Sequence, residues 1–228
     1  MYRIPTRRLY ALAMIALPVM VPASAPWRQA IAAAPVAADE SAVSTGSWLC
    51  GRYSEAVAAS RSDAASEVVS AVRSFALGYV YGVSDAVGKP LPGTASIDRR
   101  IVERLDSGCS ADPARAVRDA TLLAGRAMLE DAQSVSGNAA PGATGSLACN
   151  AHLDAAAPAE PSSRPAQVHN WADGYINARF ERAGRGMIPT ARNKALMLER
   201  FAAACAAMPS ATVREAARSV ADAALPAR

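Results

Sequence analysis

The chain has 228 residues, of which 51% are hydrophobic, with 24 basic and 20 acidic side chains and two histidines. This length is enough for one or two small domains with apolar cores. Residues 1–38 hold four arginines and no acid, so the remainder is about neutral. A nucleic-acid-binding domain, which needs a basic patch on its folded surface, is therefore disfavoured.

The first 38 residues have the layout of a secretory signal peptide. Three arginines precede an apolar run over 9–21, and small residues follow. The run is too short to make a good membrane span. Cleavage is predicted after Ala25 or Ala38, and Ala38 is favoured because the first alternative would leave Pro26 at the new N-terminus. We therefore expect a periplasmic or secreted protein without stable membrane insertion after signal removal, beginning with a polar tail over 39–47.

The rest of the chain contains an internal repeat. Two aromatic-x-x-Gly-Tyr segments are each followed by a cysteine 31 positions after the glycine. These segments run from Phe75 to Tyr79 and from Trp171 to Tyr175, and the cysteines are Cys109 and Cys205. Such self-similarity indicates one structural unit used twice. We predict a first module over 48–133 and a second over 147–228, joined by a flexible linker over 134–146 that is rich in Gly, Ala and Ser.

A short helix over 48–59 is predicted to open the first module, and a long amphipathic helix over 64–87 follows it. In the long helix, apolar side chains recur every three or four positions as one stripe. Its members are Val68, Val72, Phe75, Tyr79, Val83 and Val87. Glycine weakens a helix, so Gly78, Gly82 and the repeated Gly174 predict a close approach by another helix or side chain.

Two more helices are predicted after the break at 89–93. Ser96 is the predicted N-cap of the third, and Asp112 with Pro113 is predicted to open the fourth. A core-facing row ends at the second cysteine of each copy: Ile97, Ile101, Leu105 and Cys109, then Met197, Phe201 and Cys205.

The last helix of the second copy is predicted to begin at Pro209 and Ser210. Alanine is abundant and the β-branched alternation of strands is missing. The predicted fold class is therefore all-α, with two tandem bundles of about four helices each.

Four cysteines in an exported chain suggest disulfide bonds, because the periplasm is oxidising. The sequence allows three pairings, and the repeat favours closure of each copy on itself, Cys50 with Cys109 and Cys149 with Cys205. A four-cysteine zinc site is disfavoured because no Cys-x₂₋₄-Cys pair is present.

Residues suited to catalysis are scarce. The two histidines, His152 and His169, both lie in the second copy, and the sequence has no glycine-rich phosphate loop, His-Glu-x-x-His motif or nucleophile elbow. We therefore expect a protein that is not an enzyme, has no catalytic or metal-binding residues and uses no cofactor. Its expected partners are other proteins and not nucleic acid.

The order of these motifs resembles that of the HdeA/HdeB-like periplasmic proteins. The shared pattern is a cysteine helix, a long helix with aromatic-x-x-Gly-Tyr, a helix ending in Cys-x-x-x-Pro, and a final helix. Here it occurs twice, as a tandem duplication. The resemblance implies that Cys50–Cys109 and Cys149–Cys205 correspond to the family disulfide, and Gly78-Tyr79 and Gly174-Tyr175 to its central helix signature.

The family protects periplasmic proteins from aggregation at low pH, and the resemblance implies the same activity here. Acid would neutralise the carboxylates while the arginines stay charged, so the bundles would loosen while the disulfides tethered them. The aromatic residues of the signature would then be exposed to unfolded client proteins: Phe75, Tyr79, Trp171 and Tyr175.

Two alternatives remain open. The segment from Phe75 to Ala86 is also similar to the central helix of small exported immunity proteins, which neutralise toxins delivered by type VI secretion. Such a protein would bind one specific toxin at neutral pH in its folded state. Tandem helical units could also serve as a structural module of the envelope. The sequence leaves the oligomeric state open.

Overall fold

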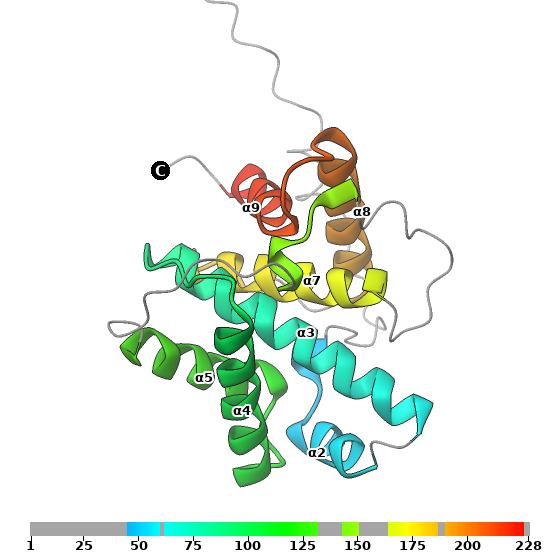
Figure 1. Ribbon diagram of the computed structural model, residues 1–228, viewed down its shortest axis with the longest axis vertical. Helices are drawn as coiled ribbons and strands as arrows, with labels where there is room; N and C mark the ends of the chain where they lie inside the picture. Colours follow the sequence, from blue (N-terminus) through cyan, green and yellow to red (C-terminus); the bar gives the residue numbers. More distant parts are fainter. Residues whose placement is uncertain (1–44, 60–61, 132–142, 151–163, 187–189, 226–228) are drawn as a thin grey trace, which may run out of the picture. The chain divides into compact units, whose positions relative to one another are not determined.

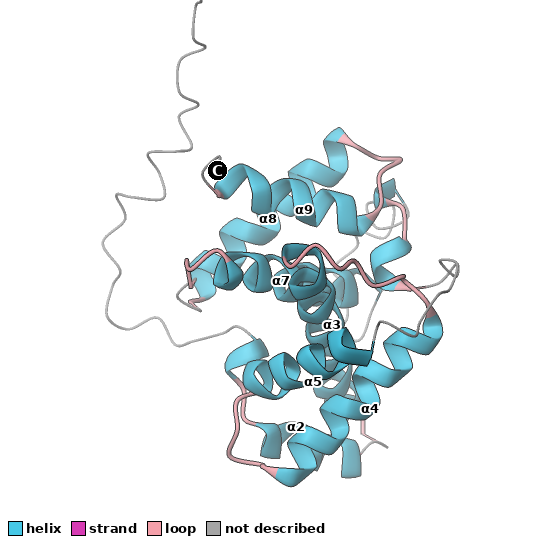
Figure 2. Ribbon diagram, turned by 90° about the vertical axis from the view of Figure 1, so that its left-hand side faces the viewer, coloured by secondary structure: helices cyan, strands magenta, loops and turns pink. Residues whose placement is uncertain are grey.

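The computed structural model describes residues 45–59, 62–131, 143–150, 164–186 and 190–225, which lie within the compact unit Ala37–Arg228. The predicted signal peptide and most of the predicted linker lie outside these ranges. Within them every named element is helical, which confirms the all-α class (Figures 1 and 2). The elements are η1 (Thr45–Ser47), α2 (Cys50–Ala58), α3 (Asp63–Ala86), α4 (Ala95–Ala111), α5 (Val117–Asp131), η3 (Thr144–Ser146), α7 (Arg164–Arg182), α8 (Ala191–Ala207) and α9 (Val213–Ala224).

The two long helices, α3 and α7, pack against each other between the remaining helices of the two copies. Figures 1 and 2 both show α2, α4 and α5 on one side of this pair, and α8 and α9 on the other. One apolar cluster continues from the first copy into the second, since Tyr81 and Ile97 belong to the same cluster as Trp171 and Phe201. The copies thus share part of their core.

Each copy is closed by its own disulfide. The bonds join Cys50 to Cys109 and Cys149 to Cys205, which is the pairing that the repeat favoured. The predicted core-facing rows are also confirmed, because every member of both rows is buried. Each disulfide therefore ties the start of its copy to the core-facing row of the third helix.

The last helix of each copy begins later than predicted. α5 begins at Val117 and not at Asp112–Pro113, and α9 begins at Val213 and not at Pro209. Asp112 instead ends α4. The physical reason is a set of long-range backbone hydrogen bonds that hold the intervening segments in non-helical conformations. Cys50 N donates to Arg115 O (2.8 Å) and Gly51 N to Pro113 O (2.7 Å), and the second copy repeats this with Cys149 N to Ala211 O (2.9 Å) and Asn150 N to Pro209 O (2.9 Å).

The caps of α4 and α9 are threonines. The α4 N-cap is Thr94 and not the predicted Ser96, and its hydroxyl accepts from Ile97 N at 3.2 Å. Thr212 caps α9 through a capping box, in which its hydroxyl accepts from Glu215 N (3.2 Å) and the Glu215 carboxylate accepts from Thr212 N (2.7 Å). Thr94 and Thr212 thus accept hydrogen bonds from backbone N–H groups that would otherwise be unpaired in the first turn of a helix.

Replacing Thr212 with alanine is expected to lower the free energy of unfolding by about 1 kcal/mol, because the cap and its box are both lost. Denaturant unfolding followed by circular dichroism measures this change. Thr212→Ser, which keeps the hydroxyl, is the matched control and should restore most of the loss. Equal unfolding midpoints for the alanine variant and the wild type would contradict the cap's contribution.

Each copy begins with a Thr-Gly-Ser turn that belongs to the fold. Residues 45–47 were predicted as part of a polar tail and 144–146 as part of the linker, but they form η1 and η3. Gly46 and Gly145 are buried. A Cβ atom at Gly46 would lie 2.6 Å from the Phe75 ring, and one at Gly145 would lie 2.6 Å from the Trp171 ring. The turns therefore cover equivalent aromatic side chains of α3 and α7.

Candidate functional site

The helices α3 and α7 cross at equivalent glycines. A Cβ atom at Gly78 would lie well under 3.0 Å from the backbone oxygen of Trp171, and one at Gly174 would overlap that of Phe75 in the same way. Gly78 and Gly174 are 96 positions apart, as are Phe75 and Trp171. The contact is therefore reciprocal, with each copy presenting the same face to the other. It is the close approach that the glycines were predicted to permit.

The second contact of the crossing is not symmetric. A Cβ atom at Gly82 would lie 2.5 Å from Tyr175 O and 2.9 Å from the Cβ of Ala178. Ala178 is the residue equivalent to Gly82 in the second copy. Gly82 of the first copy thus faces Ala178 of the second copy at this contact. The space between the two helices holds the methyl group of Ala178 but not a second methyl group at position 82.

The four aromatic residues predicted as a client-binding surface are buried at this crossing. Phe75, Tyr79, Trp171 and Tyr175 are each at most 1% exposed. Within each helix the rings stack in pairs, with centroids 5.9 Å apart for Phe75 and Tyr79 and 5.3 Å apart for Trp171 and Tyr175. The Phe75 and Tyr79 rings lie in the core of the first copy, to which α7 contributes Ala178. The Trp171 and Tyr175 rings lie in the cluster that both copies share. Separating α3 from α7 would therefore remove part of the cover of these rings.

A buried carboxylate in the last turn of α3 connects the first copy to the second. The side chain of Asp85 is only 2% exposed. Arg214 of α9 donates to it through two nitrogens, Nε to Oδ2 at 3.0 Å and Nη2 to Oδ1 at 2.5 Å. Arg218 Nη2 (2.7 Å) and the Tyr175 hydroxyl (2.5 Å) donate to Oδ2. Charge-assisted and bidentate bonds of this kind are among the stronger hydrogen bonds in proteins.

The equivalent carboxylate of the second copy has a poorer set of partners. Glu181 corresponds to Asp85, and it accepts a hydrogen bond from the Tyr79 hydroxyl at 2.6 Å. The equivalents of Arg214 and Arg218 are Arg118 and Leu122. Arg118 donates to its neighbour Asp119 (3.3 Å), and among the described residues Glu181 forms no ion pair. The tyrosine-to-carboxylate bond is thus repeated, whereas the arginine pair is unique to Asp85.

Burial by itself raises the pKa of the Asp85 carboxyl, but hydrogen bonds from Arg214, Tyr175 and Arg218 outweigh burial and hold the pKa below its usual range. Burial and the bond to Asp85 raise the pKa of the Tyr175 hydroxyl to about 12. At neutral pH Asp85 is therefore an ionised acceptor, and Tyr175 is a protonated donor to it.

We expect the free energy of unfolding to fall as the pH drops below about 4. The contribution of Asp85 is complete above its unfolded pKa and is lost as the pH falls through its lowered folded pKa. Hydrogen bonds from Thr212 lower the pKa of Glu215, which acts in the same direction. Burial raises the pKa of Asp98, which accepts from the Tyr81 hydroxyl, so this group opposes the trend. Urea unfolding over a pH series measures the slope, and stability that rises towards acid would contradict the dominance of Asp85.

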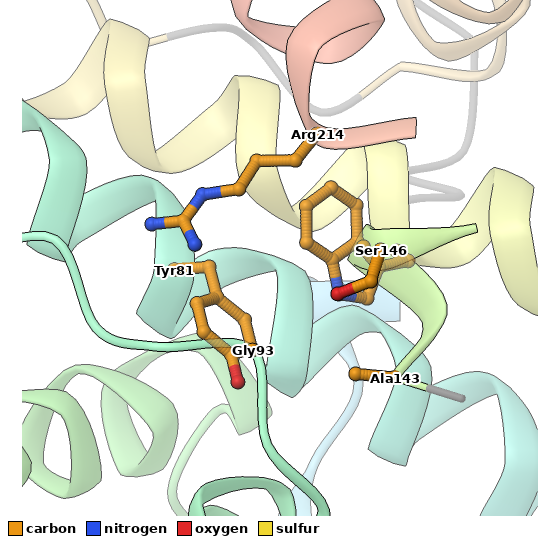
Figure 3. A pocket seen from close by; sticks show the side chains of 7 residues that line it. Tyr81, Gly93, Ala143, Ser146 and Arg214 are labelled. Carbon is orange, nitrogen blue, oxygen red and sulfur yellow. The ribbon is translucent and has the colours of Figure 1, made fainter. Parts of the chain in front are cut away.

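A small hollow lies beside this cluster, with a volume of about 10 Å³, which is roughly the space that one water molecule needs. Figure 3 shows Arg214 reaching over the Tyr81 ring, with Ser146 and Ala143 across the hollow. The Arg214 guanidinium carbon lies 5.0 Å from the ring centroid, and Arg214 Nη1 donates to Leu91 O at 2.9 Å. The hollow is too small for an organic ligand.

The described residues place two large apolar side chains on the surface. Leu49 (54% exposed) and Leu123 (47%) are its exposed large apolar side chains. Across these ranges no three His, Cys, Asp or Glu side chains come together as a metal site. The helices described also lack the combined length and apolarity that crossing a membrane requires.

The two histidines do not form a site that can be described. His152 lies outside the described residues. His169 is on α7 with its ring edge-on to Phe201, and burial together with the Lys194 ammonium lowers its pKa. Its imidazole is therefore neutral at pH 7.

Asp85, Arg214 and Arg218 were not predicted as site residues from the sequence. Asp85 and Glu181 occupy equivalent positions, six residues after Tyr79 and Tyr175, and this repeated acid was a signal. The repeated Thr-Gly-Ser before each first cysteine was another. The partners of Asp85 could not be identified in this way, because Arg214 and Arg218 lie 129 and 133 positions away and Arg218 has no basic counterpart in the first copy.

Comparison with known proteins found no matching family, no matching curated protein and no matching solved structure.

Proposed function

We propose that this is an exported envelope protein that binds unfolded proteins in acid and keeps them from aggregating, as the HdeA/HdeB-like proteins that its repeats resemble do. It acts by binding, without catalysis and without a cofactor. Its partners are a broad set of client proteins.

The observation that carries the proposal is that four aromatic side chains are buried on the two helices that cross, while an ionised carboxylate links the two copies. Phe75, Tyr79, Trp171 and Tyr175 face the interior at neutral pH, where Asp85 is paired with two arginines. Protonation of Asp85 removes the charge that Arg214 and Arg218 share. The two guanidinium groups then repel each other and the link between α3 and α9 weakens.

The two disulfides support this mechanism because they remain intact in acid. Each bond lies within one copy and none joins the copies. Opening of the crossing therefore leaves each copy internally tethered. An apolar surface appears without release of the whole chain into a fully unfolded state.

The test is light scattering from a periplasmic extract that is shifted to a pH of about 2–3, where carboxylates are protonated. The chain beginning at Asp39, with both disulfides formed, is added at increasing amounts, and the reduced chain is the control. We expect suppression of aggregation in acid by the oxidised chain and none at neutral pH. No suppression at any pH would overturn the proposal and direct the search to a single folded partner at neutral pH, such as a toxin.

A further inference from the structure

We propose that the long-helix face of each copy is a docking surface specific for the other copy. The first face consists of Phe75, Gly78, Gly82 and Asp85 on α3. The second consists of Trp171, Gly174 and Ala178 on α7 with Arg214 and Arg218 on α9. The two faces bind each other even when the segment between the copies is cut. Neither face binds a second molecule's identical face, so pairs of two first copies or of two second copies do not form.

The reciprocal glycines allow the two helices to approach closely, but they do not determine which copies pair. Gly78 meets the backbone of Trp171, and Gly174 meets the backbone of Phe75. A pair of two first copies would place Gly78 against Phe75, and a pair of two second copies would place Gly174 against Trp171. In both cases a glycine still meets a backbone oxygen, so this part of the contact tolerates all three combinations.

Steric fit excludes a pair of two second copies. In such a pair, Ala178 would occupy the place of Gly82. Its methyl group would then lie 2.5 Å from Tyr175 O and 2.9 Å from the Cβ of the facing Ala178. Real Cβ atoms essentially never show separations below 3.0 Å, and backbone atoms cannot rotate away. The helices would have to separate at the crossing, and the backbone contact at the glycines would be lost.

Charge disfavours a pair of two first copies. Asp85 would then face Arg118 and Leu122 in place of Arg214 and Arg218. A carboxylate that is 2% exposed would lose one of its two arginines at each end of the pair. The remaining Arg118 is also engaged by Asp119 at 3.3 Å.

In the second copy, the acid next to Arg214 is held by another residue and does not compete for this arginine, unlike Asp119 next to Arg118 in the first copy. Glu215, the equivalent of Asp119, is held by Thr212 in the capping box of α9. The position equivalent to Thr212 in the first copy is Ala116, which has no hydroxyl. Arg214 is thus available to Asp85, and only the mixed pair combines this arginine set with the glycine at position 82.

The experiment uses the full oxidised chain with a protease site placed within residues 132–142. After cleavage, the two pieces are unfolded together in denaturant with disulfides intact, refolded by dilution and weighed by native mass spectrometry. We expect the mixed pair to exceed each like pair by at least about tenfold. Pieces that separate, or random proportions in which the mixed pair is only twice as frequent as each like pair, would overturn the proposal.

Two variants test the two halves of the argument separately. Ala178→Gly removes the methyl clash and should allow pairs of second copies to form. Leu122→Arg supplies the missing arginine and should allow pairs of first copies, whereas Leu123→Arg, at an exposed position one residue along, should not. Each effect is expected as a several-fold rise of one like pair, and the absence of both rises would contradict the assigned origins of specificity.

Discussion

Replacing Gly78 with leucine is expected to cost on the order of 5 kcal/mol of stability or more, among the largest effects for a single substitution. The new Cβ atom would overlap the backbone oxygen of Trp171, and no side-chain rotation relieves an overlap with backbone. α3 and α7 would have to separate, which would open the part of the apolar core that the two copies share. Denaturant unfolding of the oxidised chain at neutral pH, followed by circular dichroism and tryptophan fluorescence, measures the loss.

The control is Gly186→Leu, because a Cβ atom at Gly186 would meet nothing within 4 Å. Its midpoint should stay within about 0.5 kcal/mol of the wild type, as is usual for surface substitutions. Gly174→Leu should be as damaging as Gly78→Leu, since the contact is reciprocal. An unfolding midpoint for Gly78→Leu equal to that of the wild type would contradict the close contact between α3 and α7 at Gly78.

Replacing Asp85 with asparagine is expected to lower the free energy of unfolding at neutral pH by about 3–5 kcal/mol, the range for breaking a buried ion pair. The substitution keeps the shape of the side chain and its bond to the Tyr175 hydroxyl, but it removes the negative charge between Arg214 and Arg218. The difference from the wild type should shrink as the pH falls, because Asp85 itself becomes protonated there. Urea unfolding at neutral and acid pH measures both quantities.

Glu181→Gln is the matched control for Asp85→Asn. Glu181 is the equivalent carboxylate, it accepts from the Tyr79 hydroxyl, and it forms no ion pair among the described residues. A glutamine can still accept that hydrogen bond, so we expect a loss of no more than about 1 kcal/mol. Equal losses for the two variants would show that the arginine pair does not distinguish the two ends of the crossing.

The features that the sequence predicted correctly are local in origin or follow from the repeat. The row from Ile97 to Cys109 is set by helical periodicity, and all of its members are buried as expected. The long helix predicted over 64–87 spans Asp63–Ala86. The disulfide pairing followed from the repeat, which favours closure of each copy on itself, with cysteine separations of 59 and 56 positions.

The features that were missed depend on contacts between distant residues. Asp112-Pro113 has the local chemistry of a helix start, but the bonds from Cys50 N and Gly51 N to the backbone of this segment prevent it. The repeat marks Asp85 and Glu181 as equivalent acids, but it does not identify the partners of Asp85. The importance of Asp85 comes from Arg214 and Arg218, and only the packing of one copy on the other brings these residues to it.

The duplication gives the chain an internal partner. Two copies that were predicted as modules over 48–133 and 147–228 present matching faces, and the backbones of α3 and α7 meet at their glycines. A change of charge at one carboxylate can therefore act on the contact between the copies, while the disulfides hold each copy together. In the proposed mechanism, this arrangement is what connects the pH of the surroundings to the exposure of the aromatic residues.

The pH at which aggregation suppression begins, measured by light scattering for the wild type and for Asp85→Asn, tests the central claim most directly. If the loss of the Asp85 charge opens the crossing and the opened crossing binds clients, the variant should begin to protect at a higher pH than the wild type, and Glu181→Gln should not. The same onset for all three chains would contradict the claim that the Asp85 cluster controls activity. Absence of protection by all three at every pH would contradict the proposed activity itself.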